Sequence, residues 1–313
     1  MSDRPANARH WAEYLALRGA VGALGALGIR RAGRVGATLG ALGHHPFGIR
    51  RAVVERQVAE SFPEWPREQV ERVALESYRS LGTTSIEAAV LGRLGPADVL
   101  AMFSGAEGWE LIERPAREGR GVLLVTGHLG NWELGGAYMA ARGVPIDAIA
   151  RHMENPLVDG YLTRTRQRLG MRVVHDEAAV RQVPRAIRGG RSVAMLVDQG
   201  AVGLASTWVP FFGRDAKTPR GPAVFALRLD APVVFGCALR EPDGRYRMHL
   251  ESVEVPRTGD RDADVDRIVA GYTATLERWV RRAPGQYFWQ HRRWKHQRPA
   301  AAIETPSTAG AST

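Results

Sequence analysis

Short apolar runs that alternate with helical stretches constrain the fold of this 313-residue chain more than any other feature. Predicted strands occupy 121–126, 146–150, 171–174, 193–197 and 233–239, and predicted helices occupy 108–118, 131–142, 156–169, 177–188 and 221–229. Strands that alternate with helices form a largely parallel sheet with both faces covered. We therefore predict an α/β fold: a single domain with a central, mostly parallel or mixed sheet flanked by helices.

The flanking regions extend this plan. Helices are predicted across 51–94, a loop from 197 to Pro219, a strand at 246–251 that pairs with 233–239 in a hairpin, and a last helix at 262–282. The predicted organisation is a basic, glycine-rich, membrane-proximal segment at 1–50, a domain at 51–297 and a disordered tail at 298–313.

The N-terminal segment permits two interpretations. Its apolar run from Gly19 to Ile29 is shorter than the ~20 residues needed to cross a bilayer. Arginines follow it, and Gly36 and Gly40 form a GxxxG spacing. One interpretation is a closely packed helical hairpin, and the other is an interfacial anchor with arginines at the lipid head groups. There is no pattern of a cleavable signal peptide.

The charge of the chain is +10, and only Lys217 and Lys295 among its 43 basic residues are lysines. Arginine binds phosphate and carboxylate bidentately, and a basic surface attracts anionic lipids or an acidic carrier protein. Nucleic acid is not an expected partner, because zinc-finger, RNA-binding and basic heptad patterns are all missing from the sequence. The single cysteine, Cys237, lies in an apolar run and is predicted to be buried and inert.

A histidine and a carboxylate, His128 and Glu133, frame a predicted strand-to-helix turn. Side chains five positions apart lie ~140° apart around a helix, so these two can meet only across a turn. Gly130 permits that turn, and Asn131 is a good helix cap. Glu133 can then accept a hydrogen bond from one imidazole nitrogen and leave the other free as a general base. Taken alone, the pattern also fits a capping histidine and a glutamate that satisfies the helix dipole.

Four ordered blocks between about 50 and 296 resemble the lipid A biosynthesis lauroyl/myristoyl acyltransferase family of the lysophospholipid-acyltransferase-like superfamily. The likeness extends to relatives that acylate phosphatidylinositol mannosides. The blocks are the H-x4-E turn at His128, the stretch from Arg151 to Asp159, the Val197-Asp198-Gln199 segment with 208–213 and 218–222, and the segment from Pro284 to Lys295.

This resemblance implies a glycerol-3-phosphate acyltransferase-like fold and an O-acyltransferase. The enzyme would move a fatty acyl group from acyl carrier protein or acyl-CoA to a hydroxyl of a lipid A precursor or related glycolipid. It would act at the cytoplasmic face of the bacterial inner membrane, as a peripheral protein or with a single N-terminal anchor. No cofactor is expected.

The implied catalytic residues are His128 and Glu133. The candidate substrate-binding residues are Arg151, Asn155, Asp159, Asp198, Gln199 and Arg292. For Asn155, helix capping ahead of Pro156 is an open alternative. Asp198 and Gln199 follow a strand and are expected either to orient the histidine or to bind acceptor hydroxyls.

The basic cluster of Arg292, Arg293 and Lys295 either binds a lipid head group or forms a solvated face with Trp289 and Trp294 packed inward. Seven further histidines lack a comparable partner nearby in sequence and are interpreted as structural. They are His44, His45, His152, His175, His249, His291 and His296.

Two other function classes stay open: a thioesterase that uses water as acceptor, and a non-catalytic lipid-binding protein. Direct transfer is expected, because a G-x-S-x-G nucleophile elbow is absent from the sequence. No metal is expected, because the sequence has neither HExxH nor clustered histidine and aspartate ligand spacing.

Overall fold

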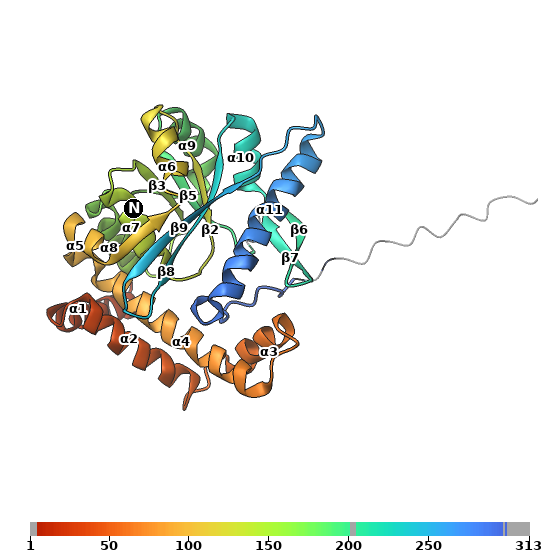
Figure 1. Cartoon of the computed structure of the whole chain (residues 1–313). Helices are drawn as coiled ribbons and strands as arrows, with labels where there is room; N and C mark the ends of the chain where they lie inside the picture. Colours follow the sequence, from red (N-terminus) through yellow and green to blue (C-terminus); the bar gives the residue numbers. More distant parts are fainter. Residues whose placement is uncertain (1–4, 201–204, 297, 299–313) are drawn as a thin grey trace, which may run out of the picture.

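The structure is a computed structural model that describes residues 5–200, 205–296 and 298. Its centre is a seven-stranded sheet within this described part, in the order β1-β9-β8-β2-β5-β3-β4 (Figure 1). Strands β8, β2, β5, β3 and β4 run parallel, whereas β9 is antiparallel to β8 and parallel to β1. The predicted α/β fold with a mostly parallel sheet is confirmed.

The elements follow one another along the chain with short connections. The strands of the sheet are β1 (Phe103–Glu107), β2 (Leu123–Thr126), β3 (Ile146–Ala150), β4 (Arg172–His175), β5 (Ser192–Leu196), β8 (Val233–Arg240) and β9 (Tyr246–Val253). The helices are α1 (Ala8–Ala26), α2 (Ile29–His44), α3 (Arg51–Ser61), α4 (Arg67–Val90), α5 (Pro96–Ala101), α6 (Glu110–Arg117), α7 (Trp132–Ala141), α8 (Pro156–Arg168), α9 (Asp176–Arg188), α10 (Gly221–Leu229) and α11 (Arg261–Arg282), with short 3-10 turns η1 (Leu91–Arg93) and η2 (Pro284–Gln286). Every strand and helix predicted from residue 108 onward is present, within a few residues of its predicted bounds.

The side chains of the central strands alternate between two hydrophobic cores, one on each face of the sheet. On β2, Leu123 and Val125 belong to one core and Leu124 belongs to the other. The first core packs against α10 and α11, and the second packs against α5 and α7. The buried thiol of Cys237 lies in the first core, and burial raises its pKa, as expected of an inert cysteine.

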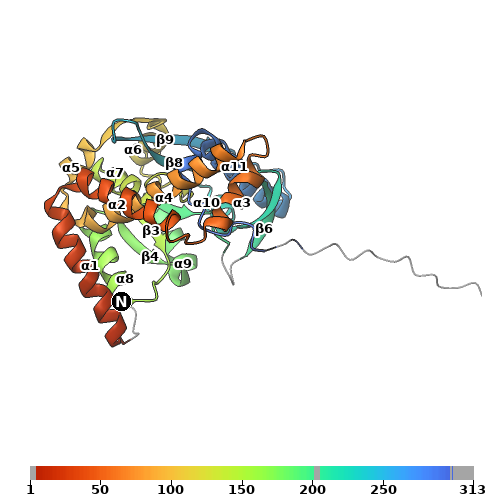
Figure 2. The same ribbon diagram turned by 90° about the horizontal axis from the view of Figure 1, so that it is seen from below.

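The N-terminal helices form a layer across one end of the sheet (Figures 1 and 2). Helix α2 lies against α4 through the predicted GxxxG pair: a Cβ on Gly40 would sit 2.0 Å from the carbonyl oxygen of Tyr78, and one on Gly36 2.4 Å from that of Gly82. Helix α1 lies beside α8 (Figure 2). The close helix packing expected of a helical hairpin is therefore present. However, α2 packs mainly on α4 and not on α1 alone.

One prediction of local structure was wrong, and one strand of the sheet was missed. The loop expected before Pro219 contains an antiparallel hairpin, β6 (Ser206–Phe211) and β7 (Arg214–Pro219). Strand β1 was not predicted at all. Strand β1 lies at the sheet edge with one buried residue, and β7 reads Arg-Asp-Ala-Lys-Thr-Pro, so neither has a clear hydrophobic pattern.

Within the described ranges, no helix combines the length and apolar character needed to cross a membrane. The predicted disordered tail, 298–313, lies outside the described residues except for Arg298.

Candidate active site

The turn after β2 carries His128 into the carboxyl end of the sheet. Gly130 adopts a φ of 65°, and a Cβ there would lie 2.0 Å from the carbonyl oxygen of Ala238, so both conformation and space require glycine. Asn131 caps α7 by accepting a hydrogen bond from Leu134 N at 3.0 Å. The predicted turn and cap are confirmed.

Two other segments hold this turn in place. Asn131 N donates to Ala238 O at the end of β8 (2.9 Å). From the C-terminal block, Phe288 N donates to His128 O and Gln286 O accepts from Gly130 N, both at 3.0 Å. The fourth sequence block thus supports the backbone of the histidine turn.

The carboxylate beside His128 is Asp198. Strands β2 and β5 pair in parallel with Thr126 opposite Leu196, so the residues two positions beyond each strand, His128 and Asp198, emerge side by side. Asp198 Oδ1 lies 2.7 Å from His128 Nδ1, and Oδ2 accepts from the backbone N–H of His128 at 2.8 Å. A carboxylate on Nδ1 fixes the proton there and leaves Nε2 as the basic nitrogen.

Asp198 is held ionised in a buried position. Its side chain is 3% exposed, and burial alone would raise its pKa. The charge and hydrogen bonds of His128, with the nearby positive charge of Arg293, outweigh burial and hold the pKa of Asp198 below its ordinary value. The Tyr287 hydroxyl also bonds to Asp198, and burial raises the pKa of Tyr287 well above its ordinary value, so that hydroxyl keeps its proton.

The free side of the imidazole is partly open. The His128 side chain is 16% exposed, and the ring of Trp132 meets it edge-on with centroids 4.7 Å apart. The Gln199 amide nitrogen lies 3.2 Å from His128 Nε2. Asp198 and Gln199 therefore both lie next to the histidine. This position agrees with the first of their two expected roles, which was to orient the histidine.

Glu133 does not contact the imidazole as expected. Its two carboxylate oxygens accept hydrogen bonds from Arg166 Nε and Nη2, at 2.9 and 2.6 Å. This two-point ion pair joins the first turn of α7 to α8, and both side chains are largely buried. A guanidinium fork satisfies both oxygens of a carboxylate at once, which a single imidazole N–H does not. Asp198, and not Glu133, is the carboxylate that contacts Nδ1 of His128.

The Arg151–Asp159 block serves mainly to build its own loop. Asn155 caps α8 and donates to His10 O at 3.0 Å and to Glu13 Oε2 at 2.9 Å, so the capping alternative accounts for its side chain. Asp159 is buried against the His152 ring. Arg151 is half-exposed and pairs with Asp176 at 3.0 Å.

The C-terminal basic cluster is divided between surface and core. Arg292 is exposed, but Arg293 is buried and donates to Lys217 O at 2.7 Å and to Thr218 Oγ1 at 2.6 Å. Trp289 is buried, and the Trp294 ring stacks on Phe211. The alternative with inward-packed tryptophans is correct, and the expectation that Arg293 belongs to a surface cluster is wrong.

One supporting group escaped the sequence analysis. Glu87 of α4 is buried and accepts a hydrogen bond from the Asn131 side chain at 2.8 Å and another from Tyr246 Oη at 2.5 Å. Burial raises the pKa of Glu87 despite the opposing charge of Arg240. A lone acidic residue inside the Thr-Ser-Ile-Glu-Ala-Ala-Val run is the signal that would have identified it.

Several of the histidines interpreted as structural do have carboxylate partners. His249 Nδ1 lies 3.0 Å from Glu107 Oε2, and His44 Nε2 lies 3.4 Å from Glu55 Oε1. The Nε2 atoms of His44 and His291 are both buried without a hydrogen-bond partner among the described residues, and burial lowers the pKa of His291 to about 4.

Comparison with known proteins decides the family. The sequence profile of the bacterial lipid A biosynthesis acyltransferases matches residues 4–296. The chain belongs to that family. It is therefore an acyltransferase that transfers groups other than aminoacyl groups, and the match includes the N-terminal helices.

Individual relatives align over most of the chain. The lipid A biosynthesis palmitoleoyltransferase of Escherichia coli is 28% identical over 264 residues, which cover 83% of this chain and 84% of that protein. The lauroyltransferase of the same organism is 27% identical over 264 residues, with 84% of each covered. The phosphatidylinositol mannoside acyltransferase of Mycolicibacterium smegmatis is 23% identical over 217 residues, covering 66% and 69%.

Proposed function

We propose that this acyltransferase moves a fatty acyl group from an acyl thioester to a hydroxyl of a lipid A precursor or related glycolipid. The observation that carries the proposal is the buried Asp198 carboxylate on Nδ1 of His128, which leaves Nε2 as a base in a partly open site. The names of the aligned relatives support the acceptor class.

In the proposed reaction, His128 Nε2 takes the proton of the acceptor hydroxyl. The hydroxyl oxygen of the acceptor attacks the thioester carbonyl carbon at the same time. The new C–O bond forms, the C–S bond breaks, and the imidazolium returns the proton to the departing thiolate. Asp198 holds the tautomer and stabilises the transient imidazolium. General-base assistance of this kind contributes on the order of 10²–10⁴ in rate.

Two groups near the imidazole complete the proposed site. The N–H groups of Trp132 and Glu133 open α7 and have no acceptor among the described residues, so they can donate to the oxyanion of the tetrahedral intermediate. The Gln199 amide beside Nε2 takes the place of the acceptor hydroxyl until substrate arrives.

In the proposed site, Glu133 acts through its ion pair with Arg166 and does not act on His128. Their ion pair fixes the first turn of α7, and with it the two amides, against α8. Arg151 follows β3 at the carboxyl end of the sheet, and Arg292 lies in the C-terminal block. Both are exposed and stay candidates for a phosphate of the acceptor or of the donor. An acidic donor, acyl carrier protein or acyl-CoA, is consistent with the charge of +10.

We also propose that the α1–α2 layer rests on the cytoplasmic face of the inner membrane. Large apolar side chains that are exposed in the described part of the chain concentrate there; they are Trp11, Leu15, Leu27, Leu39, Leu42, Phe47 and Ile49. Leu39 and Leu42 of α2 are 52% and 41% exposed although the helix packs on α4. Because α4 contacts the histidine turn through Thr84 and Glu87, this layer and the base share one end of the molecule.

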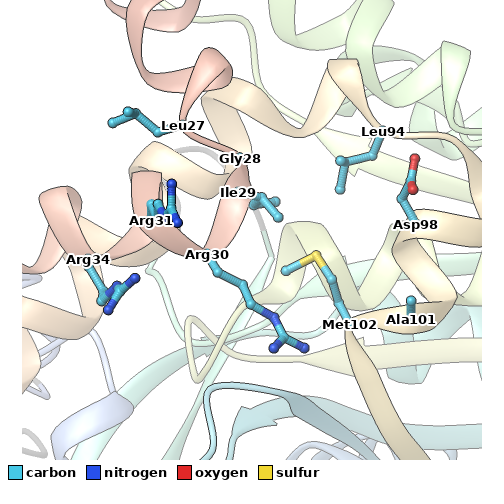
Figure 3. Close-up of a pocket in the computed structure, with 10 residues that line it drawn as sticks. All are labelled: Leu27, Gly28, Ile29, Arg30, Arg31, Arg34, Leu94, Asp98, Ala101 and Met102. Carbon is cyan, nitrogen blue, oxygen red and sulfur yellow. The ribbon is translucent and has the colours of Figure 1, made fainter.

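Arginines accompany the apolar residues at the junction of the two helices. Arg30, Arg31 and Arg34 are exposed, and the structure gives none of them a side-chain ion pair within the described residues. They border a cavity of about 520 Å³ whose apolar lining includes Ile29 and Met102 (Figure 3). Cations over an apolar cavity fit an anionic phospholipid, and each arginine near such a surface contributes about 1 kcal/mol.

The transfer reaction is tested with purified protein, acyl carrier protein thioesters or acyl-CoA, and either a lipid A precursor or a phosphatidylinositol mannoside, read by lipid mass spectrometry. We expect acylated lipid with the wild-type protein and a loss on the order of 10²–10⁴ in rate for His128→Ala. Acyl release without acylated lipid would show a thioesterase. Lipid binding without turnover would show a binding protein.

Membrane attachment is tested by sedimentation with vesicles. Binding to vesicles that contain phosphatidylglycerol should fall roughly 10- to 100-fold when Arg30, Arg31 and Arg34 are changed to Gln. The matched control changes three exposed arginines of α9, Arg181, Arg185 and Arg188, to Gln. Equal losses in both variants would mean that net charge alone governs binding.

A further inference from the structure

Two histidines and an aspartate meet at the far edge of the sheet, away from His128. His152 follows β3, Asp159 lies in the first turn of α8, and His175 ends β4. One potential ligand atom from each lies within 4.8 Å of the other two. We propose that these three side chains bind one divalent transition-metal ion of the zinc class.

The fold brings these groups together although they lie far apart in sequence. Strands β3 and β4 pair in parallel with Ala150 opposite His175, so the chain leaving β3 carries His152 over the end of β4. The rings of His152 and His175 stack with centroids 3.6 Å apart. Asp159 is buried beside them, with Oδ2 2.9 Å from His152 Nδ1. A spacing of this kind is invisible to a search for local metal motifs.

The donor set has the chemistry of a zinc-class site. Imidazole nitrogens with a carboxylate suit zinc and its transition-metal neighbours, whereas calcium and magnesium prefer oxygen ligands alone. A further carboxylate is close, since Glu177 Oε2 lies 3.9 Å from His152 Nε2. This exposed glutamate can complete a four-coordinate site, or water can do so.

His175 offers a ring nitrogen that no other group of the described chain uses. Its Nδ1 is buried and has no hydrogen-bond partner in the described part of the chain. An unpartnered buried nitrogen is unusual in proteins and becomes satisfied when it ligates an ion.

One side-chain rotation accompanies binding. The two rings are within 14° of parallel and their centroids are 3.6 Å apart, so their lone pairs lie in separate, nearly parallel planes and do not meet at one ion. The terminal torsion of histidine is broad, and the His152 side chain is 25% exposed on a loop, so this ring is free to turn. Asp159 is anchored by Met153 N at 3.3 Å and keeps its place.

A bound ion would fasten the Arg151–Asp159 loop to the end of β4. The site is separated from β2 by β5 and β3 in the sheet order. None of its three ligands contacts His128 or Asp198 in the described residues. The inference therefore stands apart from the proposed acyl transfer, and metal binding can be measured without any assay of that reaction.

The test uses the full-length protein without an affinity tag, freed of metal with a chelator and then titrated with Zn²⁺ or Co²⁺. We expect one ion per chain by calorimetry and metal analysis, a Co²⁺ ligand-field spectrum abolished by Zn²⁺, and a rise in Tm on adding Zn²⁺. His175→Gln and His152→Gln should each weaken affinity at least 10- to 100-fold and remove the Tm rise.

His249→Gln is the matched control, because His249 has a carboxylate partner, Glu107, but belongs to no such group of three. It should bind the metal like the wild-type protein. The proposal is overturned if the wild-type protein fails to bind Zn²⁺ at micromolar concentration, or if the His175 and His249 variants bind equally. Asp159→Asn provides a further folded variant should a histidine variant fail to fold, and it too should lose affinity.

Discussion

Two carboxylates could have served His128, and the one nearer in sequence is not the one that meets it. Glu133 is five positions away, at the start of α7, and is engaged by Arg166. Asp198 is seventy positions away, at the end of the neighbouring strand, and contacts both the ring and the backbone of His128. Strand register in a parallel sheet places side chains together more tightly than proximity along the chain does.

The two carboxylates also differ in their surroundings. Asp198 is buried and has an imidazole, an amide and a tyrosine hydroxyl as partners. Glu133 retains some exposure and has a permanently charged partner. A carboxylate beside an imidazole can respond to proton transfer, whereas one held by a guanidinium is a fixed structural charge. We therefore propose that Asp198 at the strand end takes part in the chemistry and that Glu133 at the helix start supports the fold.

The largest effect expected from this comparison is that of Asp198→Asn. The amide preserves shape, but it removes the negative charge and can donate to Nδ1, which stabilises the wrong imidazole tautomer. We expect kcat to fall on the order of 10²–10⁴, with circular dichroism unchanged. A rate within a few-fold of wild type would remove Asp198 from the mechanism.

Glu133→Gln should have a smaller effect on kcat, about 10-fold or less, and a clear effect on stability. Losing Glu133 leaves the largely buried Arg166 without its partner; breaking a fully buried pair costs about 3–5 kcal/mol, and the residual exposure here reduces this to about 1–3 kcal/mol. Urea unfolding measures the loss, and adding Arg166→Met should restore most of it. If Glu133→Gln abolished transfer as fully as His128→Ala at unchanged stability, Glu133 would be the orienter after all.

The sequence predicted most of the fold because the central strands are continuous apolar runs and the helices have clear ends. The turn at His128 was predicted in detail because Gly130 and Asn131 each have a specific local role. Glu133 was expected as the carboxylate partner of His128, but the partner is Asp198. The partner depends on which strand lies next to β2 in the sheet. Periodicity gives no strand order, and the β2–β5 adjacency skips β3 and β4 in the chain.

The smallest expected effect concerns His291, whose partly buried ring lies within the C-terminal block that supports the histidine turn. Burial lowers its pKa to about 4, whereas an unfolded histidine titrates near ~6.5, so between these values the unfolded chain binds more protons than the folded one. The free energy of unfolding should therefore decrease as the pH falls through this window. The full shift corresponds to ~3 kcal/mol, and partial solvent exposure of the ring reduces this to about 1–2 kcal/mol.

His291→Gln isolates that contribution, because glutamine cannot take up the proton. Urea unfolding at pH 7 and pH 5 should show a smaller loss of stability for this variant than for the wild-type protein. His45→Gln, at an exposed histidine, serves as the control and should keep the wild-type dependence. Identical pH dependence in the wild-type protein and in His291→Gln would show that the C-terminal block tolerates a charged ring. The pH sensitivity of the fold would then have to come from the carboxylates, with Asp198, whose pKa is lowered, losing its stabilising charge only in stronger acid.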